Sequence, residues 1–279
     1  MYKNLILLIF MLFCFQAHGK RYKNISYLDS ENSYEKKKHL LDVYTPNDSE
    51  DKAEVLIFIH GGSWRSGNKN LYKFFGKRLS DKGKVVVIIN YQLHPHAVIT
   101  QMIRECASAV KWVYDNIEDY GGLKTKLYVS GHSAGGHLAA LLSTQNAWFD
   151  SLNIANPIAG CILIDAFALD MYDYLNKREY SAKNTFFTTF SQIEEVWKNR
   201  SPINHVSAST PPILVYTGSK TYGSILKSGK AYHNKLAGLK VNSKYTEMPG
   251  KKHIPMMFQL YNRKNLLYDE FIQFMEENG

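Results

Sequence analysis

The sequence predicts an α/β fold: a doubly wound, mostly parallel sheet with helices on both faces and a small helical cap-like insertion. Short, continuously apolar runs rich in β-branched residues recur along the chain, which is typical of strands buried on both faces. Segments with apolar residues at helical spacing separate these runs. One aromatic-rich stretch, residues 166–200, interrupts the alternation.

The expected strands begin with one or two leading antiparallel strands within residues 20–45. The later runs alternate with helical segments, as parallel strands joined by crossover helices do. The apolar runs that predict these parallel strands are Val55–Ile59, Val85–Asn90, Leu127–Val129, Ile162–Ile164, Ile213–Tyr216 and Val241–Met248.

Helical periodicity appears in three places between and after these strands. Apolar residues recur at helical spacing from Ile103 to Ile117, again from Gly136 to Thr144, and near the C-terminus from Leu266 to Phe274. Residues 166–199 show no clear strand but many aromatic side chains. They predict either a small cap over the carboxyl edge of the sheet or helices that pack on the core without contacting a ligand.

The first nineteen residues have the composition of a secretory signal peptide. Lys3 precedes an apolar run from Leu5 to Phe15, and the segment ends in Ala-His-Gly. We expect cleavage after Gly19, a secreted or periplasmic protein, and no stable membrane insertion of the mature chain. An uncleaved membrane anchor is the alternative, although the apolar run is short for a bilayer.

Composition limits the remaining function classes. With 279 residues, of which 45% are hydrophobic, residues 20–279 suffice for one large domain. The net charge is +9, but the basic residues are scattered and no basic helix with interleaved aromatics is present, which argues against nucleic acid. Cys106 and Cys161 lie in apolar segments and are expected to be buried free thiols, although a bridge is open. The oligomeric state stays undetermined.

Ser133 is the candidate nucleophile. Gly131-His132-Ser133-Ala134-Gly135 fits the pattern G-x-S-x-G and follows a predicted strand and precedes a predicted helix. Small neighbours allow a sharp turn that lifts the serine hydroxyl clear of the sheet. Because a serine hydroxyl alone is a weak nucleophile, a base and an orienting acid are needed.

A glycine-containing loop after the strand Val55–Ile59 supplies candidate oxyanion donors. Its residues Gly61, Gly62 and Ser63 can turn backbone N–H groups toward a developing oxyanion, and the N–H of Ala134 would add another. His60, which precedes this loop, is expected to hold the loop in place.

Taken together, these motifs resemble α/β-hydrolases of the esterase/lipase group, which includes bacterial carboxylesterases and kynurenine-formamidase-like enzymes. The resemblance implies an α/β-hydrolase fold over nearly all of the mature chain. It rests on LDVYTP (41–46), HGGSW (60–64), SGNK (66–69), YQLHP (91–95), GHSAGGH (131–137), SPI (201–203) and PPILV (211–215).

The histidines supply a candidate general base and a possible pair of metal ligands. His253 follows the last predicted strand in a loop, in the order Ser then His that this architecture uses, and is the candidate base. His94 and His96 form an H-x-H pair, but two ligands do not make a metal site. We expect no metal and no organic cofactor.

The acid is not evident. The family places it after the penultimate strand, where this chain has Thr221, a neutral residue. Asp165, at the end of the strand Ile162–Ile164, could reach His253, or it could be a helix cap or a loop-fixing carboxylate. Asp170, Glu247 and no acid at all are the other possibilities.

The sequence therefore predicts a serine hydrolase that cleaves a small ester or amide through an acyl-enzyme. Ser133 would attack, His253 would move the proton, and Asp165 is the proposed acid. Aromatic residues after Asp165 suggest an apolar acyl or aryl pocket, and a formamidase acting on an N-formyl aromatic amine is one version. A non-catalytic binding protein is the alternative, because of Thr221.

Overall fold

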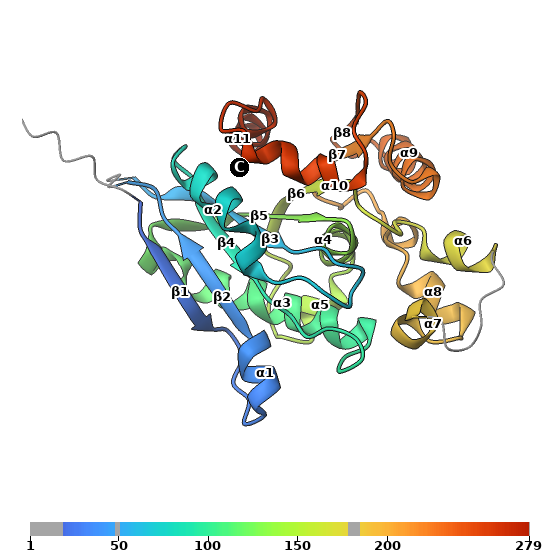
Figure 1. The fold of residues 1–279 in the computed structure, drawn as a ribbon, viewed down its shortest axis with the longest axis horizontal. Helices are drawn as coiled ribbons and strands as arrows, with labels where there is room; N and C mark the ends of the chain where they lie inside the picture. Colours follow the sequence, from blue (N-terminus) through green and yellow to red (C-terminus); the bar gives the residue numbers. More distant parts are fainter. Residues whose placement is uncertain (1–18, 48–50, 178–184, 279) are drawn as a thin grey trace, which may run out of the picture.

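A computed structural model describes residues 19–47, 51–177 and 185–278. The predicted signal peptide therefore lies outside the described residues, except for Gly19. Within these ranges, eight strands form one sheet (Figure 1). They are β1 (Arg21–Ser26), β2 (Leu40–Tyr44), β3 (Ala53–Ile59), β4 (Val85–Ile89), β5 (Gly122–His132), β6 (Ile158–Ile164), β7 (Ile213–Gly218) and β8 (Ser243–Met248).

The strand order is β1-β2-β4-β3-β5-β6-β7-β8. β1 pairs with β2, and β2 with β4, in antiparallel fashion, whereas every other pair is parallel. This confirms the predicted fold class, including the leading antiparallel strands. β5 is longer than the run Leu127–Val129 because it begins in a polar segment, residues 122–126, that carries no apolar pattern.

The helices follow the strands in the predicted alternation. The last helix confirms the C-terminal periodicity. The described α-helices are α1 (Ser33–Lys38), α2 (Lys73–Ser80), α3 (Ile99–Asn116), α4 (Ala134–Thr144), α5 (Ala147–Asp150), α6 (Met171–Asn176), α7 (Thr185–Phe190), α8 (Glu194–Asn199), α9 (Gly223–Gly238), α10 (His253–Phe258) and α11 (Leu267–Glu277). Short 3-10 turns are η1 (Lys69–Tyr72), η2 (Ile117–Tyr120), η3 (Pro202–His205) and η4 (Gln259–Tyr261).

Two apolar layers cover the sheet because side chains alternate along each strand. In β3, Val55, Ile57 and Ile59 join a core cluster with α3 and α4. Leu56 and Phe58 point the other way and join a second cluster with α2, α10 and α11. The same helices lie on opposite sides of the sheet in Figure 1.

None of the described helices is both long and apolar enough to span a membrane.

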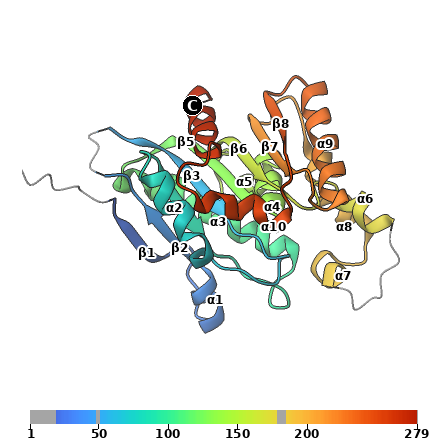
Figure 2. The ribbon, with the colours of Figure 1, turned by 45° about the horizontal axis from the view of Figure 1, so that its top comes forward.

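The aromatic-rich stretch forms three short helices, α6, α7 and α8, which gather at the end of the molecule that also holds α9 (Figure 2). The stretch contributes side chains both to the core and to a cavity wall. Phe190 and Trp197 are buried in the core, whereas Phe167 lines a cavity. Residues 178–184 lie outside the described part.

The two described cysteines are free and buried, as the sequence indicated. Cys106 lies in α3 and Cys161 in β6. Burial raises the pKa of the Cys161 thiol to about 12 and also raises that of Cys106. Both thiols are therefore protonated and unreactive at neutral pH.

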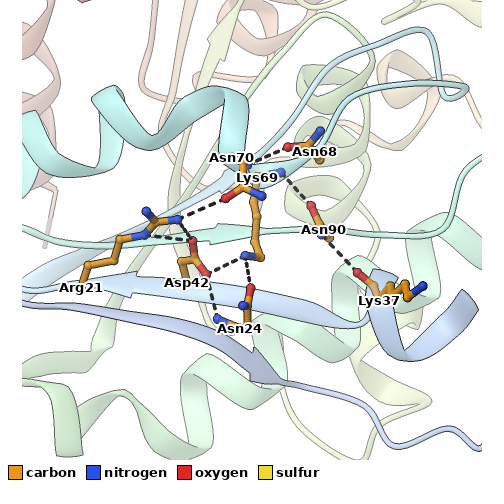
Figure 3. Close-up of polar contacts among 8 residues, drawn as sticks. All are labelled: Arg21, Asn24, Lys37, Asp42, Asn68, Lys69, Asn70 and Asn90. Atoms are coloured by element: carbon orange, nitrogen blue, oxygen red, sulfur yellow. Dashed lines mark hydrogen bonds and ion pairs between the residues drawn. The ribbon is translucent and has the colours of Figure 1, made fainter. Parts of the chain in front are cut away.

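A buried ionic cluster joins the leading strands to the start of η1 (Figure 3). The Asp42 carboxylate accepts hydrogen bonds from Lys69 Nζ at 2.7 Å and from Arg21 Nη2 at 2.5 Å. Lys69 Nζ also donates to Asn24 Oδ1, and the Lys69 backbone N–H donates to Asn90 Oδ1. Because η1 follows the glycine-containing loop 60–68, this cluster anchors the end of that loop.

Removing one partner from this cluster should destabilise the fold. Burial alone would raise the pKa of Asp42, but hydrogen bonds from Lys69 and Arg21 hold it below its ordinary value. Asp42→Asn leaves Lys69, which is 2% exposed, without its countercharge. We expect a loss of about 3–5 kcal/mol in the free energy of unfolding, measured by urea titration.

The pH dependence checks the cause. A depressed folded pKa contributes stability above the unfolded pKa of about 3.9, and that stability is lost as the pH falls through the folded value. The difference in the free energy of unfolding between wild type and Asp42→Asn should therefore become smaller below about pH 4. Glu118→Gln, which breaks exposed ion pairs with Lys52 and Lys124, is the control, and its free energy of unfolding should change much less than that of Asp42→Asn. A similar loss of unfolding free energy in Asp42→Asn and Glu118→Gln would contradict the claim that the buried Asp42–Lys69 pair stabilises the fold.

Candidate active site

Ser133 stands in a strained turn between β5 and α4. Its φ is 57° and its ψ is −121°, a backbone conformation that L-residues rarely adopt. The turn exists because small residues surround it. A Cβ on Gly135 would lie 2.0 Å from the Ile59 carbonyl oxygen, and one on Gly131 would lie 2.3 Å from the Gly135 carbonyl carbon. The G-x-S-x-G spacing thus reflects contact between the turn and β3.

A hydrogen-bonded row of three side chains begins at this turn. His253 Nε2 lies 2.8 Å from Ser133 Oγ, and His253 Nδ1 lies 2.5 Å from an Asp165 carboxylate oxygen. Asp165 directly follows β6 and is completely buried. His253 is the first residue of the short helix α10. The expectation that it lies in a loop is therefore wrong.

The Asp165 carboxylate also contacts the end of β7. Its Oδ1 accepts the Gly218 backbone N–H at 2.8 Å, so Asp165 fixes a loop as well as contacting His253. The Thr221 hydroxyl donates to Oδ2, the same oxygen that contacts His253. Thr221 thus stands at the family's usual acid position and is bonded to a carboxylate that comes from the neighbouring strand.

The other carboxylates considered as acids are engaged elsewhere. Asp170 caps α6 by accepting the Asp173 N–H at 2.9 Å. Glu247, on β8, pairs with Lys230 at 3.0 Å. Neither contact involves His253.

The loop after β3 lies beside Ser133 and lines the same cavity. The Gly61 N–H donates to the Tyr72 hydroxyl at 3.3 Å, so its role as an oxyanion donor is the weakest of the four expected. Gly62 and Ser63 have φ of 129° and 53°, and the Gly62 carbonyl closes the loop by accepting Ser66 N at 3.0 Å. Ala134 is the first residue of α4, so its N–H has no acceptor within the helix.

His132 is a site residue that the sequence did not indicate, because it occupies a variable position of the serine motif. Its Nε2 donates to the His253 carbonyl at 3.1 Å, and its ring stacks on that of His253 with centroids 4.7 Å apart. Burial and the nearby His253 lower its pKa to about 4. The neutral ring therefore holds the start of α10 in place.

The contacts of His60, His94 and His96 are those of supporting residues. Burial lowers the pKa of His60 to about 4, and its Nδ1 donates to the Gly61 carbonyl at 2.9 Å. In the H-x-H pair, His94 contacts the Thr188 hydroxyl at 3.2 Å and His96 packs on Tyr34. Across the described ranges, no group of three or more His, Cys, Asp or Glu side chains could hold a metal ion.

Ser133 opens into a cavity of about 860 Å³. One wall comes from the cap and consists of Phe167, Tyr174 and Phe186. Trp64 lies within the glycine-containing loop 60–68 and is 1% exposed. It packs edge-on against Phe167 and Phe186 and so joins this wall to the loop.

The chain is similar to proteins named as esterases and to a formamidase. Residues 41–236 match the family model BD-FAE. A probable isoprenylcysteine alpha-carbonyl methylesterase of Arabidopsis thaliana is 26% identical over 78% of this chain, which spans about half (49%) of that relative's length. Kynurenine formamidase of Danio rerio is 28% identical over 81% of this chain and 74% of its own. A truncated carbohydrate esterase from gut microbiota superposes with a TM-score of 0.80 at 19% identity, covering 94% and 97% of the two chains.

Gly135→Ala tests the close packing of the turn on β3. The added methyl group would meet the Ile59 carbonyl, so the backbone must shift, and we expect a loss of about 1–3 kcal/mol or more in a urea titration. Gly238→Ala is the control, since a Cβ there meets no atom within 4 Å and alanine suits a helix better than glycine. Equal stability of Gly135→Ala and wild type would refute the argument.

Proposed function

This chain belongs to the BD-FAE family, and we propose from that premise that it is a serine hydrolase that cleaves small carboxylic esters through an acyl-enzyme. The observation that carries the proposal is the continuous row from Ser133 through His253 to Asp165. A nucleophile, a base in hydrogen-bond reach and a third group that orients the base are the parts that acyl transfer requires. The esterase names among its relatives support the same reaction.

The geometry suggests a role for each group. Ser133 Oγ attacks the carbonyl carbon while His253 Nε2 takes its proton. The N–H groups of Gly62, Ser63 and Ala134 stabilise the charge that develops on the carbonyl oxygen. His253 then gives the proton to the leaving alcohol, and water releases the acyl group by the same steps. Asp165 holds the ring and stabilises the imidazolium.

The alternative of a non-catalytic binding protein depended on Thr221. A threonine at the acid position would indicate lost activity if no carboxylate reached His253. Asp165 supplies that carboxylate from the adjacent strand, and the Thr221 hydroxyl supports it. We therefore propose Asp165 as the acid and Thr221 as a positioning residue, and this contact favours an enzyme over a binding protein.

Hydrolysis of p-nitrophenyl butyrate tests the row. Ser133→Ala should abolish turnover above background, and Asp165→Asn should lower kcat by about 10⁴, because the neutral amide cannot stabilise the imidazolium. Asp170→Asn is the control, since asparagine also caps a helix and should keep wild-type activity. Turnover that survives Ser133→Ala would exclude the proposal, and loss in Asp170→Asn instead of Asp165→Asn would reassign the acid.

The role of Thr221 can be tested by moving the acid. Thr221→Val removes the hydrogen bond to the Asp165 carboxylate and should lower kcat roughly tenfold with little change in KM. Thr221→Ser keeps a hydroxyl that can make this hydrogen bond and should retain the wild-type kcat. In Asp165→Asn/Thr221→Asp, a carboxylate returns at the family's usual position. We expect at least about a tenfold gain over Asp165→Asn alone, with both kinetic constants measured for all variants.

Two results would argue against this role. If Thr221→Val behaves as wild type, the hydroxyl does not position the acid. If the double variant is no more active than Asp165→Asn, residue 221 does not lie in reach of the base.

A further inference from the structure

We propose that the substrate carries an extended apolar chain and that an exposed apolar rim around the cavity binds that chain. The inference rests on the proposed function, because it assigns a substrate class to the same site. The apolar rim is made of five side chains that line the cavity and are each 49–59% exposed. They are Leu71, Tyr222, Ile254, Phe258 and Tyr261.

The gathering of these side chains is the first argument. Single exposed apolar residues are ordinary on protein surfaces. In the described part of the chain, however, five of eleven exposed large apolar side chains lie around one cavity. A contiguous exposed apolar patch marks a binding surface, since it leaves apolar area in water unless something covers it.

The charge of the lining is the second argument. Lys, Arg, Asp and Glu make up 21% of the chain, yet none of the described residues that line the cavity is one of these. Among these described lining residues a buried charged group would find no Lys, Arg, Asp or Glu as a countercharge, which is costly. An amino-acid substrate, with its ammonium and carboxylate groups, is therefore disfavoured, and an uncharged ester fits.

Part of the rim is supported by packing beside the candidate base. Ile254 and Phe258 lie on α10, the helix that His253 begins. Tyr261 stacks on Phe74 with centroids 3.8 Å apart, and the Arg78 guanidinium, which donates to the Leu260 carbonyl, lies over both rings. A rigid apolar surface binds a chain with little loss of its own side-chain entropy.

The rim and the cap wall belong to different layers of the fold. Phe167, Tyr174 and Phe186 pack with the core cluster on one face of the sheet, whereas α10 packs with the cluster on the other. Both line the cavity that holds Ser133. An ester bound at Ser133 thus meets apolar surface on two sides, one for its acyl part and one for its alcohol part.

Two ester series distinguish these parts. p-Nitrophenyl esters from acetate to octanoate lengthen the acyl chain, and acetates of ethanol to octanol lengthen the alcohol. We expect the wild-type kcat/KM to rise with chain length in at least one series. Ile254→Ser and Phe258→Ser should flatten that rise, so that the eight-carbon ester loses roughly tenfold more than the shortest ester, mainly through KM. The series that flattens identifies the part of the substrate on the rim.

Leu266→Ser is the matched control, because Leu266 is 73% exposed and does not line the cavity. Its chain-length dependence should equal that of wild type. If the rim variants keep the wild-type dependence, or lose activity equally on short and long esters, the rim does not bind the chain, while turnover that requires Ser133 still supports the proposed function. If wild type cleaves no ester of either series, the proposed function itself fails.

Discussion

The buried carboxylate of Asp165 is the constraint around which the site is arranged. A buried charge is tolerated only when hydrogen bonds satisfy it. Here the bonds come from Gly218 at the end of β7, from Thr221 in the following turn and from His253 after β8. One side chain after β6 thereby ties together the loops that follow the next two strands.

Contacts of other kinds hold the remaining parts of the site. The glycine loop is anchored by the Asp42–Lys69 pair at its far end and by Trp64 against the cap. Ser133 is raised by a turn that fits only because Gly135 lies against β3. Groups on buried strands and on loops held by such contacts keep the relative positions that the proposed function requires.

The proposed acid stands one strand away from its usual place in the family. Neighbouring strands lie about 4.8 Å apart, so carboxylates after β6 and after β7 can approach the same imidazole. In this chain the usual position keeps a hydroxyl, which donates to the carboxylate instead of replacing it. Under the proposed function, substrate preference would come from the cavity walls, because the reacting groups themselves set no preference for the acyl or alcohol part.

The sequence by itself determined the fold class, the strained serine turn and the glycine loop, because these depend on residues close together in the chain and on apolar periodicity. It proposed Asp165 as the acid but left Asp170, Glu247 and no acid open, since Asp165 and His253 are 88 positions apart and no local pattern joins them. It likewise missed His132, which acts through the backbone of His253, and the rim, whose residues come from η1, the β7–α9 turn, α10 and η4. Only the tertiary structure revealed these contacts and the clustering of the rim, because they join separate loops that are distant in the chain.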